Sequence, residues 1–251
     1  EQQFGSYNFY RTLWDVGGAI TDSRSLSVRF AGGYQNSGSF RDFNFIDRKV
    51  FNPSVTWRPT DKTTMTVDVE ILKQDFRADS GIPVIGNRPA PVPISRSYGD
   101  PNTPASFTNK THIGFNLDHT FNESWKLTNR FLSSFIDAES IWANPAPAFG
   151  NALQADGRTL NRNIFGQTSY VRTYATNLDL VGTFTVAGTQ HKLLVGMDYI
   201  RAATDYGIYG NFTSGNPALA IDLFNPTYGI APSLFTAARA TTDRPGRNVS
   251  V

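Results

Sequence analysis

Cysteine is absent from the 251-residue chain, and charged side chains are scarce. Without thiols the protein can form neither disulfides nor thiolate metal sites, and it has no cysteine nucleophile. Charged residues make up 18% of the chain, below the roughly one quarter that is usual for soluble domains. The 23 basic and 21 acidic side chains leave a formal net charge of +2. A charge so close to balance provides no general attraction to nucleic acid.

Long apolar runs are also absent. No stretch of about 18 apolar residues occurs, so the sequence predicts no transmembrane helix. The N-terminus has no basic segment followed by an apolar stretch, so no signal peptide is visible. The length is nevertheless sufficient for a sizeable core. Few charges, a negative mean hydropathy and 13% aromatic residues suit a sheet with one apolar face and one polar face.

Apolar and polar residues alternate over most of the chain. For example, Met65, Val67, Val69 and Ile71 are separated by polar residues. This period of two predicts strands with two different faces, and no helical stripe of useful length occurs. The inner-facing polar residues, among them Arg29 and Asp68, are expected to face a hydrated lumen. The pattern predicts an all-β chain with eight strands, at residues 8–20, 25–36, 48–59, 63–77, 110–121, 125–142, 170–187 and 191–210.

The predicted connections are alternately short and long. The short ones have turn-type compositions and lie at 21–24, 59–62, 122–124 and 187–190. The long ones are rich in Pro, Gly, Asn and Asp and lie at 37–47, 78–109, 143–169 and beyond about 211. Most connections in compact domains have about 4–6 residues, whereas short turns on one rim and long loops on the other are typical of outer-membrane β-barrels. Aromatic residues at strand ends, such as Trp57 and Trp125, match interfacial girdles.

Several segments resemble one family, in order along the chain. Residues 5–18 (GSYNFYRTLWDVGG), 38–42 (GSFRD) and 52–63 (NPSVTWRPTDKT) resemble the first barrel strand, the first outer loop and the third strand with its turn in TonB-dependent siderophore receptors. Four further segments extend the resemblance over residues 4–229, at 81–83 (GIP), 119–127 (HTFNESWKL), 194–199 (LVGMDY) and 221–226 (IDLFNP). The chain is most similar to the ferrichrome- and hydroxamate-type receptors.

The resemblance implies an antiparallel up-and-down meander of about eight strands that is part of a 22-stranded transmembrane β-barrel in the bacterial outer membrane. Residues 1–251 would form a partial barrel domain, about strands 1–8, without the plug and the remaining strands. The segment 243–251 is predicted to be loop. Because eight strands of a wider barrel would leave two open edges in lipid, the chain is expected to be a fragment.

The resemblance also implies a function, which is the import of ferric siderophores across the outer membrane. The expected partners are the ferric siderophore, the protein's own plug and remaining barrel, outer-membrane lipid, and a TonB-type energy-coupling protein that acts through segments absent from this chain. Nucleic acid is not expected. The siderophore would be the transported ligand, so no resident cofactor is expected.

Candidate ligand-binding residues lie near the predicted outer rim. In siderophore receptors, aromatic rings and arginines from strand tips and loops hold the chelate, which brings its own metal ligands, with cation–π contacts where charge allows. By resemblance, the first candidates here are Trp142 and Tyr209. The others are Tyr206, Phe76, Arg77, Arg96 and Tyr98.

Catalytic and metal-binding patterns are not found in the sequence. His112, His119 and His191 lack metal-ligand spacing, and neither a Gly-x-Ser-x-Gly elbow nor a P-loop occurs. The chain is therefore predicted not to be an enzyme, to have no catalytic residues and to hold no metal site. An outer-membrane barrel hydrolase would need a Ser/His pair on one face near a rim. The other alternative is a small self-contained β-barrel or sandwich, in the outer membrane or soluble, that binds carbohydrate or lipid through its long loops.

Overall fold

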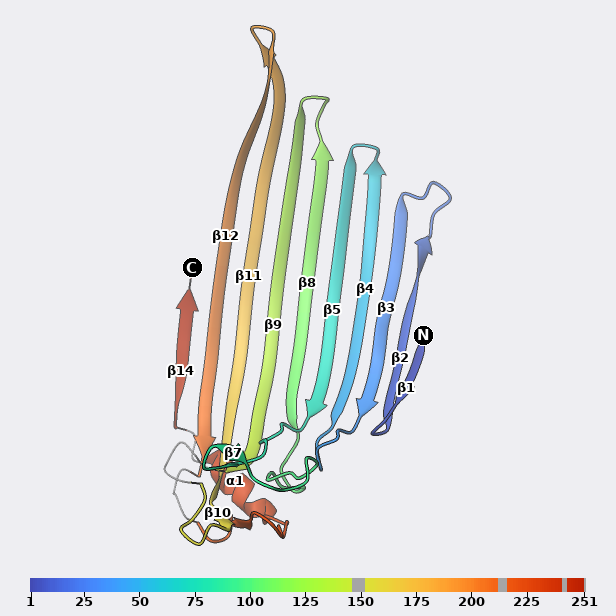
Figure 1. Ribbon diagram of the computed structural model, residues 1–251. Coiled ribbons are helices and arrows are strands. Elements are labelled where there is room, and N and C mark those ends of the chain that lie inside the picture. Colours follow the sequence, from blue (N-terminus) through green and yellow to red (C-terminus); the bar gives the residue numbers. More distant parts are fainter. Residues whose placement is uncertain (146–151, 212–215, 241–242, 251) are drawn as a thin grey trace.

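The computed structural model describes residues 1–145, 152–211, 216–240 and 243–250. Its main element is a ten-stranded antiparallel sheet in the order β1-β2-β3-β4-β5-β8-β9-β11-β12-β14 (Figure 1). The strands on one side are β1 (Gln2–Gly5), β2 (Phe9–Ala19), β3 (Leu26–Ser37), β4 (Ile46–Thr60) and β5 (Thr63–Phe76). The others are β8 (Ser106–Thr120), β9 (Trp125–Pro145), β11 (Arg162–Val186), β12 (Thr189–Gly210) and β14 (Asp243–Ser250).

Short turns join the strands at one end of this sheet, and long connections join them at the other, which we call the long-loop end (Figure 1). The long connections contain two small two-stranded sheets and a helix. β6 (Val84–Ile85) pairs with β7 (Arg88–Pro89), and β10 (Thr159–Leu160) pairs with β13 (Ile221–Asp222). The helix α1 spans Pro232–Ala240. No helix in the described part of the chain is long and apolar enough to cross a membrane.

The predicted all-β antiparallel meander is confirmed, and each of the eight predicted strands is present. The pattern does not predict two further strands of the main sheet, β1 and β14, nor the helix and the four two-residue strands of the loops. The segment after Ala240, predicted to be loop, contains β14, which pairs with the edge of β12 from Ala202↔Ser250 onward, with an irregularity between Tyr206 and Ile208. Its Pro and Gly weaken the strand pattern, but pairing satisfies backbone groups that β12 would otherwise leave free.

The first strand, β1, was missed because it is short and precedes a tight turn. Tyr7 and Asn8 adopt the left-handed conformation, with φ of 62° and 57°, which reverses the chain between β1 and β2. The segment 5–18 therefore lies mainly in the second strand, and 52–63 covers the end of the fourth. The loop at 38–42 is the second connection at the long-loop end, not the first.

The register divides the sheet into two faces. One paired row across β3, β4, β5, β8 and β9 consists of Val28, Val55, Val67, Phe115 and Phe131. The neighbouring row, whose side chains point to the opposite side, consists of Ser27, Thr56, Thr66, Asn116 and Arg130. We call these the apolar face and the polar face. Because many apolar-face side chains are exposed, such as Val55 at 42% and Val67 at 43%, this face requires an apolar environment.

The sheet is open over the described residues, since β1 and β14 are its two ends and do not pair with each other. This arrangement contradicts the alternative of a closed eight-stranded barrel. It also contradicts the alternative of a sandwich, because the two additional sheets have only two strands each. The buried core lies at the long-loop end, where loops and strand tips pack together.

Two adjacent glycines in β2 provide a test of the sheet packing. A Cβ at Gly17 would lie 2.7 Å from the carbonyl oxygen of Val28, whereas a Cβ at Gly18 would meet nothing within 4 Å. We expect Gly17→Ala to cost about 1–3 kcal/mol, because the backbone of β3 must shift, and Gly18→Ala to be nearly neutral. The measurement is the temperature at which the full-length protein in detergent loses its heat-modifiable gel migration. Equal effects of both substitutions would contradict the register.

Candidate ligand-binding site at the long-loop end

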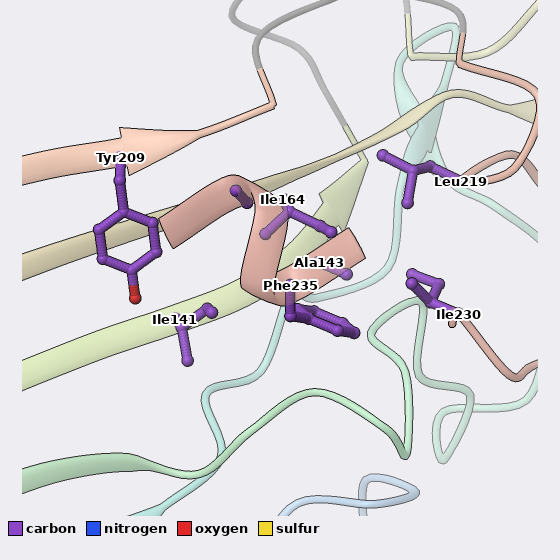
Figure 2. Close-up of a cluster of buried hydrophobic side chains, with 8 residues drawn as sticks. Ile141, Ala143, Ile164, Tyr209, Leu219, Ile230 and Phe235 are labelled. Carbon is purple, nitrogen blue, oxygen red and sulfur yellow. The ribbon is translucent and has the colours of Figure 1, made fainter. Parts of the chain in front are cut away.

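The long connections pack into one layer, which we call the loop cap and define as residues 77–105, 152–161 and 216–231. One apolar cluster joins strand tips to this cap and to α1 (Figure 2). Its members are Ile141, Ala143, Ile164, Tyr209, Leu219, Ile230, Phe235 and Ala238. A second cluster consists of Ala90, Tyr98, Leu160, Ile221 and Leu223. The first cluster joins the connection after β12 to the tips of β9, β11 and β12. The second contains residues from three connections, so these loops support one another.

A buried ion pair lies within the loop cap. Arg162 and Asp100 approach to 3.7 Å, and their side chains are 2% and 0% exposed. The Asp100 carboxylate also accepts hydrogen bonds from the backbone nitrogens of Gly229 and Ile230, at 3.0 and 3.1 Å. The Arg162 guanidinium donates to the carbonyl oxygen of Leu219 at 2.7 Å. Buried charges are tolerated only with such compensation, so this pair holds two connections in one geometry against the first residue of β11.

Arg162 also donates to the carbonyl oxygens of Gly99 and Tyr98, at 2.9 and 3.2 Å. These bonds fix the loop between β5 and β8 against the first residue of β11. No local pattern in the sequence singles out Arg162 or Asp100. Both are isolated charges in loop-like surroundings, and no spacing in the sequence indicates that they meet.

Three of the predicted ligand-binding residues hold the loops in place. Tyr98 is 0% exposed, and its hydroxyl donates to the carbonyl oxygen of Leu223 at 2.7 Å. Burial raises the pKa of Tyr98 to about 12. Arg96 donates to the carbonyl oxygen of Phe224 at 3.1 Å, and Arg77 donates to those of Phe43, Pro101 and Thr103. Their contact with a ligand stays a prediction, and for Tyr98 it would require the loop cap to open.

The two first candidates, Trp142 and Tyr209, lie on opposite faces of the sheet. Tyr209 is 3% exposed and packs with Ile141 in the cluster beneath α1 (Figure 2). Its hydroxyl donates a hydrogen bond to the carboxylate of Glu139. Trp142 follows Ile141 directly, so it points to the other side, where its ring lies 5.0 Å from that of Phe165. Tyr209 is therefore part of the packing beneath α1, and any ligand contact by it stays a prediction.

Phe76, Trp142 and Tyr206 share the polar face at the long-loop end. The register assigns all three to this side, and each is partly exposed. They come from β5, β9 and β12, so they are spread along the rim rather than gathered in one cluster. Half-exposed rings beside a polar wall are a reasonable surface for a chelate that presents both apolar and hydrogen-bonding groups.

A groove, which the sequence analysis did not predict, lies on the polar face over β2 to β5. Its volume is about 840 Å³, and Arg11, Leu13, Gly33, Gln35 and Arg48 are among the residues that line it. The alternation in the sequence already assigns these positions to one face. What it does not show is that they lie side by side near the long-loop end.

Comparison with known proteins identifies the class to which this arrangement belongs. The structure resembles the siderophore receptor PiuA from Acinetobacter baumannii with a TM-score of 0.75 and 20% identity, covering 90% of this chain and 35% of that one. It also resembles the closed form of the ferric-catecholate import receptor Fiu from Escherichia coli, with a TM-score of 0.78 and 18% identity over 92% of this chain and 34% of that one. The sheet therefore has the fold of part of an outer-membrane receptor barrel.

Sequence comparison points the same way, although no family model matches the chain. The metal-pseudopaline receptor CntO of Pseudomonas aeruginosa is 28% identical over 227 residues, covering 90% of this chain and 31% of that receptor. The ferrioxamine B receptor of Salmonella typhimurium is 26% identical over 247 residues, covering 92% and 32%. The ferrichrome outer membrane transporter/phage receptor of Escherichia coli is 24% identical over 246 residues, covering 90% and 32%.

The resemblance to TonB-dependent siderophore receptors is thus confirmed: the homologues of this chain are siderophore and metal receptors of that kind. The chain spans about a third of the length of the curated relatives it matches. The relatives named here are receptors or transporters rather than enzymes.

Loss of the buried ion pair is predicted to destabilise the loop cap strongly. We expect Arg162→Met to destabilise the cap by about 3–5 kcal/mol, because it leaves the Asp100 carboxylate buried and unpaired. The matched control is Arg158→Met, which removes the more exposed pair with Asp222 and should cost about 0–1 kcal/mol. Limited proteolysis of the purified full-length receptor, with cleavage sites mapped by mass spectrometry, should show new cuts in residues 77–105 and 216–231 only for the first variant. Equal protection of both variants would contradict this role.

The raised pKa of Tyr98 predicts that the protein loses stability at alkaline pH. The pKa of Tyr98 rises from an ordinary value of 10.0 to about 12 in the folded protein, so its stabilising effect is complete below pH 10 and is lost as pH rises toward 12. The melting temperature of the wild-type receptor should therefore exceed that of Tyr98→Phe below pH 10, and the difference should shrink at higher pH. A difference that stays constant from pH 9 to pH 11.5 would refute this prediction.

Proposed function

We propose that this chain forms part of the barrel wall and outer vestibule of a receptor that imports ferric siderophores across the bacterial outer membrane. The proposal rests on one observation: the sheet has an exposed apolar face, and long loops pack together at only one of its ends. An apolar face of this kind suits lipid, and a polar face suits a hydrated lumen. The similarity to siderophore receptors along about nine tenths of the chain supports it.

The edges of the sheet support the view that the chain is one domain segment of a larger barrel. β1 and β14 leave unpaired backbone groups at the two ends of the ladder, and such groups are costly in lipid. In the proposed receptor, further strands of the same barrel pair with both edges. A plug occupies the lumen, and a TonB-type coupling protein acts through other segments, so this part supplies the wall rather than the moving element.

The ferric siderophore is cargo in this proposal, and no resident cofactor is proposed. No group of three or more His, Cys, Asp or Glu side chains in the described residues could hold a metal ion. The chelate would therefore keep its own iron ligands, and the protein would recognise the outer surface of the complex. The partly exposed rings of Phe76, Trp142 and Tyr206 are the proposed contact residues at the rim.

The test uses the native gene product in its own cells. Because the chain covers about a third of its relatives, we expect an outer-membrane protein about three times as large as this chain, whose amount rises under iron starvation. Deleting the gene should abolish uptake of at least one ⁵⁵Fe-labelled siderophore, and expression from a plasmid should restore it. A product near 27.7 kDa that does not respond to iron, with unchanged uptake in the deletion strain, would overturn the proposal.

A further inference from the structure

One glycine shapes the floor of the groove on the polar face. A Cβ at Gly33 would lie 2.6 Å from Cδ2 of Leu13, so the side chain of Leu13 lies across this position and a larger residue would displace it. The groove has a volume of about 840 Å³, which falls within the range of about 300–1,000 Å³ that is usual for small-molecule sites. Its walls come from β2, β3, β4 and β5.

Charged side chains of both signs line this groove. Three acidic residues contribute to it, and two of them are paired with bases: Asp15 accepts a bond from Arg29 at 2.9 Å, and Glu70 forms an ion pair with Lys110. The third, Glu1, accepts a bond from the neutral amide of Gln3.

Two arginines in the groove have no such acidic partner. Arg48 donates to the neutral amide oxygen of Gln74 at 2.7 Å, and neither Arg48 nor Arg11 forms an ion pair with any described carboxylate. Once the two ion pairs are set aside, the groove presents the two guanidinium groups of Arg11 and Arg48 and the single carboxylate of Glu1.

The register brings these two groups together. Arg11 pairs with Gln35, and Gln35 pairs with Arg48, so the three side chains form one row on the polar face. With strands about 4.8 Å apart, the two arginines start from backbones about 10 Å from each other. The Gln35–Arg48 pair is third from the long-loop end of the β3–β4 ladder, so a ligand that enters from that end meets this row early.

We propose that Arg11, Gln35 and Arg48 form an anion site that makes the receptor select negatively charged ferric chelates, whose outer oxygens come from carboxylate or catecholate groups. This inference rests on the proposed function and names its substrate class. Guanidinium groups bind such oxygens through charge-assisted, often bidentate hydrogen bonds. A ferric tris-catecholate is an anion, whereas a ferric tris-hydroxamate is neutral, so the site distinguishes ligands of similar size by charge.

The experiment compares two ferric chelates on the purified full-length receptor. Binding of ferric enterobactin, which is anionic, and of ferrichrome, which is neutral, is measured by quenching of intrinsic fluorescence. We expect the wild type to prefer the anionic chelate by at least about tenfold, and Arg11→Gln/Arg48→Gln to weaken its binding by about 10- to 100-fold, in line with lost hydrogen bonds to charged groups. Ferrichrome binding should change less than about twofold.

Two further variants make the result specific. Arg130→Gln removes an arginine on the same face but outside the groove, whose partner Asp118 keeps Lys126, and it should leave the preference unchanged. Arg11→Lys/Arg48→Lys keeps both charges and should retain part of the preference. If Arg11→Gln/Arg48→Gln weakens the binding of both chelates equally and also lowers the melting temperature, the inference is overturned. The arginines would then stabilise the receptor by pairing with an acidic segment elsewhere in it.

Two other outcomes separate this inference from the proposed function. If the wild type binds ferrichrome as tightly as ferric enterobactin, or more tightly, the anion site is refuted while the receptor function stands. If it binds neither these nor any other ferric chelate and the deletion strain takes up iron normally, the receptor function fails, and the anion site fails with it.

Discussion

The antiparallel ladder from β2 to β12, which has one irregularity between Trp57 and Thr60, is the constraint on which the other features depend. Side chains alternate across a strand, so a slip of one residue in any pair would move a whole row of valines and phenylalanines into the polar side. Rows such as Val55–Val67–Phe115 on one face and Thr56–Thr66–Asn116 on the other show that the register is kept across successive strands. The same register brings Arg11 and Arg48 into one row.

The loop cap stabilises the molecule in a different way from the sheet. The apolar face is exposed and depends on its surroundings, whereas the cap buries its own apolar clusters and a compensated ion pair. Arg162 and Asp100 connect the cap to the first residue of β11, so the position of the loops follows from the position of the strands. Packed clusters at the tips of β9, β11 and β12 and a groove over β2 to β5 give the two halves of the rim different properties.

Two of the three histidines, His119 and His191, lie at the short-turn end of the sheet. The imidazole of His119 shares a hydrogen bond with Thr63 at 2.8 Å and lies edge-on to Phe121 near the short-turn end. His191 stacks on Phe184 at the same end. Both residues lie at the opposite end of the strands from the loop cap. Their surroundings therefore do not support the hydrolase alternative.

The sequence by itself determined the all-β meander, the positions of eight strands, the two faces and the asymmetry between short turns and long loops, because each follows from local alternation and turn composition. It also placed Trp142, Phe76 and Tyr206 near the rim, although it could not separate them from Tyr209, which faces the other side. Tertiary structure alone decided that Tyr98 and Arg77 hold loops together, that Arg162 meets Asp100, and that residues 243–250 add a strand. These outcomes depend on contacts between segments that lie tens of residues apart, and a single sequence carries no local pattern for such contacts.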